Sequence, residues 1–119
     1  MGMDLIPRRK TLNSYHLNWS GWRFVLQLLE DLDANLSEAS GSNDGDYVKA
    51  ETARNWAQLI ENALAADKIK LVFVPDEAYV GGGHYSTTCD EGEPLTEDYS
   101  LFLKEFCDFL RKSQGFRQY

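Results

Sequence analysis

The stretch LTEDYSLFLKEFCDFLRK, residues 95–112, decides the fold. Its apolar side chains recur at spacings of three and four residues, which places them on one face of an α-helix. These side chains are Leu95, Tyr99, Phe102, Leu103, Phe106, Phe109 and Leu110. Charged residues occupy the opposite face. A helix of this kind needs a surface to cover, and the earlier segments of the chain are predicted to supply it.

Two more helices are predicted upstream. Apolar residues at helical spacing indicate one over 22–36, with Ser20 as its N-cap, and a second over 47–67. Gly115 stands where a C′ residue would end the last helix. Residues 12–17 fit neither period, so we expect an extended or irregular segment there.

Strands are predicted at two places. Residues 69–74 are β-favouring and bounded by Pro75, and because they are apolar on both faces we expect them to be covered on both sides. Residues 3–6 form a second, short candidate. The strand at 69–74 needs a partner for its backbone groups, and the candidates are 3–6 and the tail 116–119.

The predicted fold class is therefore α+β and helix-dominated, with three main helices packed around a small sheet that holds Ile69–Val74. We expect residues 1–119 to form a single domain. Residues 75–94 show no periodicity and are rich in glycine and acids, so we expect a long, mobile loop.

Composition indicates a globular protein of the cytoplasm. The chain has 119 residues, of which 43% are hydrophobic and 13% aromatic. No apolar run approaches the roughly 20 residues of a membrane-spanning helix, and residues 1–10 do not resemble a secretory signal. We expect Cys89 and Cys107 to be reduced, and we expect no membrane association.

Acidic residues are unevenly distributed along the chain, whose formal net charge is −7. Neither the window between Arg23 and Lys49 nor that between Lys70 and Lys104 contains a lysine or arginine. The acids in these windows are Glu30, Asp31, Asp33, Glu38, Asp44, Asp46, Asp76, Glu77, Asp90, Glu91, Glu93, Glu97 and Asp98. Such surfaces repel phosphate, which disfavours direct nucleic-acid binding, and they attract a basic protein partner. The alternative is an acidic face that is merely solvated.

The acids in the second half of the first predicted helix oppose its dipole. Either the basic turn Arg8–Lys10 folds back onto these acids, or they bind a cation from outside the chain. Tyr15, Trp19 and Trp22 are aromatic residues of the kind that anchor interfaces, with burial in the core as the alternative. The predicted partner-binding residues are Trp19, Trp22, Glu30, Asp31, Asp33, Asp44, Asp46, Asp76, Glu77, Asp90, Glu91 and Glu93.

No catalytic residue, metal site or cofactor is predicted. Gly81-Gly82-Gly83-His84 lacks the Lys-Ser or Lys-Thr pair of a phosphate-binding loop. Residues 40–51 lack most of the carboxylates of a calcium loop. The alternative function is a small-ligand or hydrolytic site in the loop Gly81–Cys89, with His84 beside Cys89.

Four segments are similar to those of a loose group of small bacterial and phage proteins that have no assigned activity. They are Met1-Gly2-Met3-Asp4, residues 18–23, Asn43-Asp44-Gly45 and the closing residues 106–116, which contain a Phe-Leu-Arg-x-Ser-x-Gly-Phe motif. The chain departs from the group at Gln114, where a second glycine is expected. The resemblance implies a small cytosolic fold with phage or prophage connections.

The predicted function is a non-enzymatic, acidic module that binds a basic protein. In a phage it would inhibit a host-defence complex, in the manner of an anti-CRISPR protein or a nucleic-acid mimic. A homodimer that closes over Trp19 and Trp22 is a further alternative.

Overall fold

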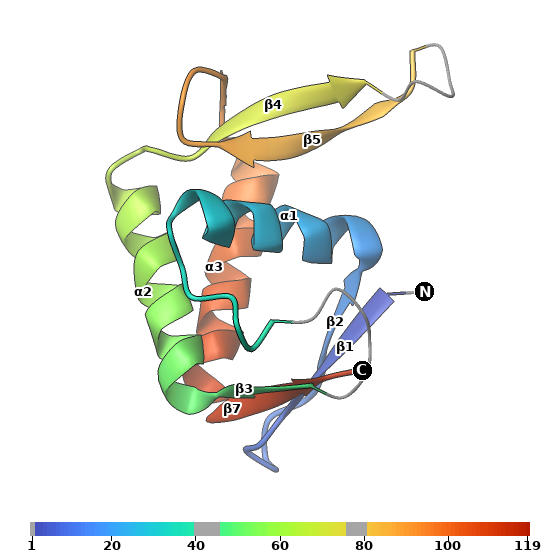
Figure 1. Cartoon of the computed structure of the whole chain (residues 1–119), viewed down its shortest axis with the longest axis vertical. Helices are drawn as coiled ribbons and strands as arrows, with labels where there is room; N and C mark the ends of the chain where they lie inside the picture. Colours follow the sequence, from blue (N-terminus) through green and yellow to red (C-terminus); the bar gives the residue numbers. More distant parts are fainter. Residues whose placement is uncertain (1, 40–45, 76–80) are drawn as a thin grey trace.

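A computed structural model describes residues 2–39, 46–75 and 81–119 (Figure 1). Within these residues the chain forms three helices and seven strands, which confirms the α+β class. The elements are β1 (Gly2–Pro7), β2 (Tyr15–Asn18), α1 (Trp19–Asp31), β3 (Asp46–Lys49), α2 (Ala50–Ala65), β4 (Lys70–Pro75), β5 (Gly83–Thr88), β6 (Glu93–Pro94), α3 (Glu97–Lys112) and β7 (Gly115–Gln118).

The described elements form two antiparallel sheets at opposite ends of the molecule, with the helices between them (Figure 1). One sheet has the order β2-β1-β7-β3 and the other the order β5-β4-β6. Helices α2 and α3 run antiparallel along the long axis, and α1 crosses them. The predicted strand at 69–74 is confirmed as β4, in a small sheet beside the three predicted helices. The four-stranded sheet is a second sheet, which was not predicted from the sequence.

Helix α3 forms as its periodicity predicts. Thr96 is the N-cap, and its hydroxyl accepts a hydrogen bond from the Tyr99 amide at 3.4 Å. Acids in the first turn and bases in the last turn complement the helix dipole. The lower half of the apolar stripe is buried, and the upper residues are partly buried against the same core.

The centre of the core lies where α2, α3 and the four-stranded sheet meet. Trp56, Phe106 and Phe116 are each 0% exposed. The rings of Trp56 and Phe116 meet edge to face with centroids 6.3 Å apart. The indole N–H of Trp56 donates to the carbonyl oxygen of Asn35 at 3.0 Å, so the polar atom of this buried side chain is satisfied.

Helix α1 begins and ends earlier than predicted. Asn18, not Ser20, is the N-cap, and its side-chain oxygen accepts from the Gly21 amide at 2.7 Å. Asparagine is among the preferred capping residues, so the start moves upstream to Trp19. The helix ends at Asp31, and Leu36 lies beyond it in the connecting segment.

The start of the second helix is also different. Asp46–Lys49 form strand β3 beside β7, with Val48 opposite Phe116, and α2 begins at Ala50. Strand β3 has four residues and buries Val48 alone, so it is too short to show a strand period of its own. Pairing with the distant β7 decides the outcome.

Residues 83–88 and 93–94, expected within a long loop, are strands β5 and β6. Both pair with β4, so neither 3–6 nor 116–119 is its partner. The predicted strand at 3–6 is confirmed as part of β1, and the tail forms β7 between β1 and β3.

The turn into β7 has two residues with positive φ. Gln114, with φ of 60°, follows the C-cap Ser113, and Gly115 has φ of 97°. A Cβ on Gly115 would lie 2.8 Å from the carbonyl oxygen of Val48. Glycine is therefore required at 115 both for its backbone conformation and for the close approach of β3.

Candidate protein-binding surface

The end of α1 presents acidic side chains on a well-ordered turn. The Asp33 amide donates to the Glu30 carbonyl, and the Ala34 amide to the Leu29 carbonyl at 2.9 Å. This is the Schellman arrangement, with Asp33 in the left-handed region at φ 57°. Glu30, Asp31 and Asp33 are all exposed there, and the last turn contains no base.

The turn between β5 and β6 brings the second group of acids to the same place. Asp90, Glu91 and Glu93 are exposed on this turn. Partial burial raises the pKa of the Cys89 thiol, and the negative charges of Asp31 and Asp90 raise it further, while Lys68 lowers it. Asp31 and Asp90 are therefore both near enough to Cys89 to act on its thiol. We call Glu30, Asp31, Asp33, Asp90, Glu91 and Glu93 the acidic end.

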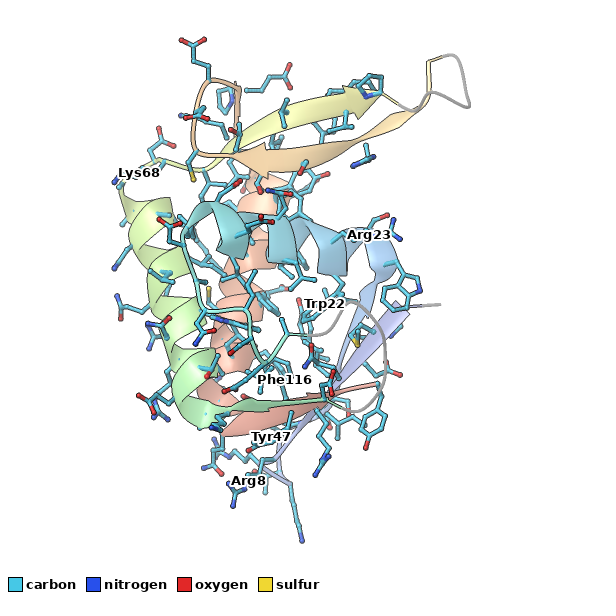
Figure 2. The ribbon with its side chains drawn as sticks, in the orientation of Figure 1. Arg8, Trp22, Arg23, Tyr47, Lys68 and Phe116 are labelled. Atoms are coloured by element: carbon cyan, nitrogen blue, oxygen red, sulfur yellow. The ribbon has the colours of Figure 1, made fainter. Side chains whose placement is uncertain are left out.

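The carboxylates of the acidic end are not neutralised by the chain's own ion pairs. In the part of the chain that the structure describes, the ion pairs join other residues. They are His16–Asp4, Lys49–Glu38, Lys70–Asp67, Arg111–Glu61 and Lys112–Asp108. The nearest compensation is the charge of Lys68 at the top of α2 (Figure 2).

The basic turn Arg8–Lys10 does not fold back onto α1. The amides of Arg8 and Arg9 donate to the carbonyl oxygens of Gly115 and Ser113, at 2.8 Å and 3.0 Å. These bonds hold the turn beside the C-terminus of α3, at the opposite end of the molecule from the β5–β6 turn (Figure 2). The basic turn Arg8–Lys10 and the β5–β6 turn therefore lie at opposite ends of the long axis (Figure 2).

The other predicted binding residues do not join the acidic end. Asp46 is exposed but lies in β3, opposite Gln118, within the four-stranded sheet. Asp44, Asp76 and Glu77 lie outside the described residues, as do residues 40–45 of the calcium-loop comparison.

Trp22 is not an interface anchor. Its side chain is 1% exposed and belongs to the core, because it faces inward on α1 (Figure 2). Trp19 is half-buried and packs against that core. Tyr15 also packs against the core, and its ring centroid lies 5.3 Å from that of Phe109. Helical spacing predicted this burial, which was the alternative to an anchor role.

Among the described residues, four of the seven exposed large apolar side chains lie on the hairpin of β4 and β5. Val72, Phe73 and Val74 are 39%, 49% and 38% exposed, and Tyr85 is 41% exposed. Coverage on both faces of β4 was therefore a wrong expectation. A continuous apolar run is typical of a buried strand. The sequence of β4 does not show that its side chains are exposed.

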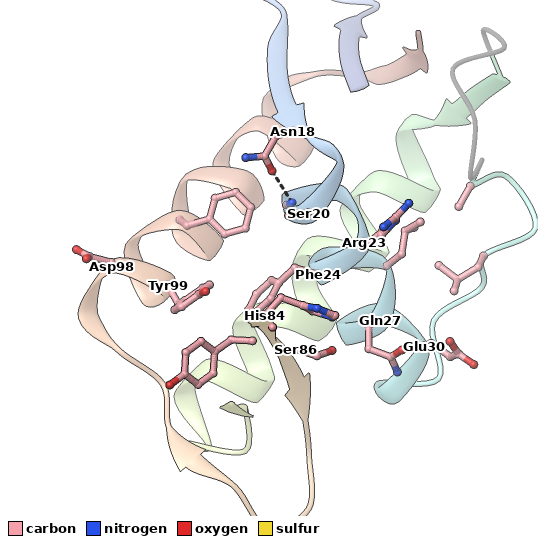
Figure 3. Close-up of a pocket in the computed structure, with 17 residues that line it drawn as sticks. Asn18, Ser20, Arg23, Phe24, Gln27, Glu30, His84, Ser86, Asp98 and Tyr99 are labelled. Atoms are coloured by element: carbon pink, nitrogen blue, oxygen red, sulfur yellow. Dashed lines mark hydrogen bonds between the residues drawn. The ribbon is translucent and has the colours of Figure 1, made fainter. Parts of the chain in front are cut away.

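A groove of about 1120 Å³ lies between β5, the outer face of α1 and the start of α3 (Figure 3). Phe24 and Tyr99 stack on its floor with ring centroids 4.9 Å apart. His84 and Arg23 supply polar groups to the groove. Glu30 also lines it, so the groove and the acidic end share this residue.

The proposed pairing of His84 with Cys89 is wrong. His84 lies in β5 opposite Val74, and Cys89 follows the end of that strand. Five residues of extended chain separate the two by about 17 Å, which is far beyond hydrogen-bond reach. The nucleophile and base of a hydrolytic site are therefore not assembled here.

Metals, membranes and known proteins provide no further assignment. Among the described residues, no group of three or more His, Cys, Asp or Glu side chains is placed to hold a metal ion. No helix in this part of the chain is long and apolar enough to cross a membrane. Comparison with protein-family models, curated proteins and solved structures finds no match.

Proposed function

We propose that the protein is a non-enzymatic binding module whose acidic end recognises a basic surface on a partner protein. The observation that carries this proposal is the convergence of Asp31 and Asp90 around Cys89. These acids come from two windows that are distant in the sequence, and the fold places them together and away from the basic turn Arg8–Lys10.

Electrostatics gives the proposal a measurable form. Charges gathered at one end of a protein steer an oppositely charged partner and raise its association rate, and salt suppresses the effect. A partner captured from an extract of the native host and identified by mass spectrometry is expected to be basic. Its association rate constant should fall steeply as salt is raised.

Two triple variants with the same change in net charge test the location of the site. Asp31→Asn, Asp33→Asn and Asp90→Asn together should slow association about tenfold at low salt. The control, Asp46→Asn, Glu51→Gln and Glu105→Gln together, should change it much less. Equal slowing in the two variants would mean that net charge, and not the acidic end, attracts the partner. A rate that is insensitive to salt would contradict the proposal outright.

The phage interpretation is one specific form of the same proposal. A host-defence nuclease that holds nucleic acid in a basic channel is a partner of the required chemistry. The resemblance of the closing motif to bacterial and phage proteins supports this choice. Competition between the protein and a nucleic-acid substrate for such a nuclease would test it.

The groove supports a second candidate function, the binding of a small ligand. Its volume, about 1120 Å³, is slightly above the roughly 300–1,000 Å³ of typical ligand sites, and the rings of Phe24 and Tyr99 supply an aromatic wall. His84 at the rim would fix the orientation of such a ligand. A nucleotide or metal that raises the melting temperature of the protein, but not of His84→Ala, would favour this function over the first.

A further inference from the structure

Strand β4 is covered unequally by its two neighbours. β5 pairs along its whole length, from Lys70 opposite Thr88 to Pro75 opposite Gly83. On the other edge, β6 pairs with Lys70 and Leu71. Among the described residues, no strand lies beside Val72–Pro75 on this edge. Alternate residues there direct their backbone polar groups away from β5 and into solvent, although Pro75 has no N–H to offer.

The side chains along this edge are apolar on both faces of the sheet. Val72 and Val74 share one face, and Phe73 lies on the other beside Tyr85, with ring centroids 5.5 Å apart. All four side chains are exposed by more than a third. Exposed edges are usually protected by lysine, a bulge or proline, and here Pro75 stands at the far end of the strand.

We propose that the edge of β4 binds an extended segment of a partner protein, which adds to the sheet as a strand beside Val72–Pro75. Strand addition would pair the open backbone groups and cover apolar side chains on both faces. This inference deepens the proposed function, because it rests on the same basic partner and states how part of that partner is held.

The direction of the added strand follows from β6. Both neighbours of β4 are antiparallel to it, and a strand that continues the line of β6 has the same direction. Its C-terminal end then meets Glu93, which lies opposite Leu71, with Glu91 close by in the turn. The segment should therefore alternate apolar residues and carry a basic residue at its C-terminal end.

Charge argues against a second copy of this chain as the occupant. Each copy has a formal net charge of −7. A copy that approached along this edge would bring that charge toward Glu91 and Glu93. A basic segment is attracted by the same side chains, so we assign the edge to a partner and treat self-association as an outcome of the test.

Three synthetic peptides with the same side chains test the proposal by fluorescence anisotropy with the full chain. The first alternates Val and Thr and ends in Arg-Lys, and the second carries the same bases at its N-terminal end. The third is the first with N-methyl groups on alternate amides. We expect the first to bind most tightly and the second about two- to fivefold more weakly. The third should bind about tenfold more weakly or worse, because it cannot complete the ladder.

Variants of the protein separate the backbone contribution from the charge contribution. Glu91→Gln together with Glu93→Gln should make the first two peptides bind equally. Val74→Lys should weaken both, whereas Leu101→Lys, a similar change at a residue of α3 that is 56% exposed, should not. Equal binding of the first and third peptides, or tighter binding of the second than the first, would overturn the inference.

Failure of this inference is distinguishable from failure of the proposed function. Strand addition is wrong, and the acidic site stands, in the following case. The acidic-end variant slows association of the captured partner but Val74→Lys does not, and the first and third peptides bind with equal affinity. If the peptides behave as expected but the captured partner is not basic, the strand site stands without the acidic one. Concentration-dependent dimerisation in analytical ultracentrifugation that Val74→Lys abolishes would assign the edge to a second copy instead.

Discussion

The side-chain amide of Gln118 donates a hydrogen bond to the carbonyl oxygen of Glu38 at 2.9 Å. The same nitrogen donates to the carbonyl oxygen of Asp46 at 3.2 Å. Gln118 is 0% exposed and lies in β7, next to β3. One buried amide therefore joins the segment after α1 to the start of β3, two parts of the chain that flank residues 40–45.

We expect Gln118→Met to lower the free energy of unfolding by about 1–3 kcal/mol. Methionine keeps the length of the side chain but removes the donor, so two carbonyl oxygens lose a partner. Chemical denaturation measures the change. Gln58→Met, on an exposed face of α2, is the control and should shift stability by less than about 0.5 kcal/mol. A loss of the same size in both variants would contradict the role given to Gln118.

Thr87 presents the opposite case. It is 4% exposed, and its hydroxyl oxygen has no hydrogen-bond partner among the described residues. Thr87→Val removes that oxygen and keeps the branched shape, so stability should rise, by about 1 kcal/mol. Thermal unfolding provides the measurement. Thr88→Val, in the same strand, should instead lower stability, because the Thr88 hydroxyl accepts a hydrogen bond from the Asp90 amide at 3.1 Å. A destabilised Thr87→Val would show that the Thr87 hydroxyl is bonded.

Asp33 adopts a left-handed conformation at the end of α1, where its charge also opposes the helix dipole. Asp33→Gly should therefore stabilise the protein, by about 0.5–1 kcal/mol, because glycine adopts this conformation without a steric penalty. Asp31→Gly, inside the helix, should instead destabilise it by a similar amount. Denaturation midpoints of the two variants should move in opposite directions.

The two thiols should differ sharply in reactivity. Burial raises the pKa of Cys107 to about 12, and its side chain is 1% exposed. Cys89 is exposed, so in the native protein a thiol reagent should modify Cys89 and leave Cys107 intact. Denaturant should make both react.

The charges beside Cys89 should also set its rate of modification. Asp31→Asn with Asp90→Asn should lower the pKa of the Cys89 thiol, which increases the thiolate fraction, and speed alkylation near pH 8 by about two- to threefold. Asp46→Asn, at the other sheet, should leave the rate unchanged. Unchanged alkylation in the double variant would mean that Asp31 and Asp90 do not converge on Cys89.

Stability in acid should depend in part on the contact between α2 and α3. The Arg111 guanidinium donates to both carboxylate oxygens of Glu61, and this hydrogen bonding lowers the pKa of Glu61. A lowered folded-state pKa contributes stability above the unfolded-state pKa, and the contribution is lost as pH falls through the folded-state value.

Wild type should therefore lose more stability than Glu61→Gln when pH falls from about 6 to about 3. The difference should be less than about 1 kcal/mol, because both side chains are 39% exposed and solvent screens the pair. Denaturation at each pH measures it. Glu105→Gln should follow the wild-type curve, and parallel curves for wild type and Glu61→Gln would contradict the lowered pKa.

Local patterns predicted the elements that a single amphipathic face defines. Helix α3 follows the spacing of its apolar residues, and β1 follows the short run before Pro7. Strand β3 was missed because it is four residues long and buries only Val48, which leaves no alternating pattern to recognise. Strand β5 was missed because its sequence, which begins at the end of a run of three glycines, is mostly polar and shows no apolar alternation. Its pairing with β4 makes it a strand.

For the candidate site too, the sequence predicts some features and others depend on how distant segments pack. The acidic windows are visible in the sequence, but their convergence at Cys89 depends on how the β5–β6 turn packs near α1. Burial of Trp22 follows from its place in the apolar stripe, since a side chain on that face of α1 must point toward the core. The open edge of β4 has no signal of its own, because it is defined by the shortness of β6.

Strand β7 lies between β1 and β3 in the sheet, but it follows both in the sequence and is therefore synthesised after them. Through most of synthesis these two strands lack their shared neighbour, although α1 and α2 are already available. The core over the inner face of β1, with Met3 and Leu5, is completed only after α3 and β7 have been made. Closing contacts over so long a span of chain is slow, so the nascent protein should reach its native form late and pass through a stage that chaperones can recognise.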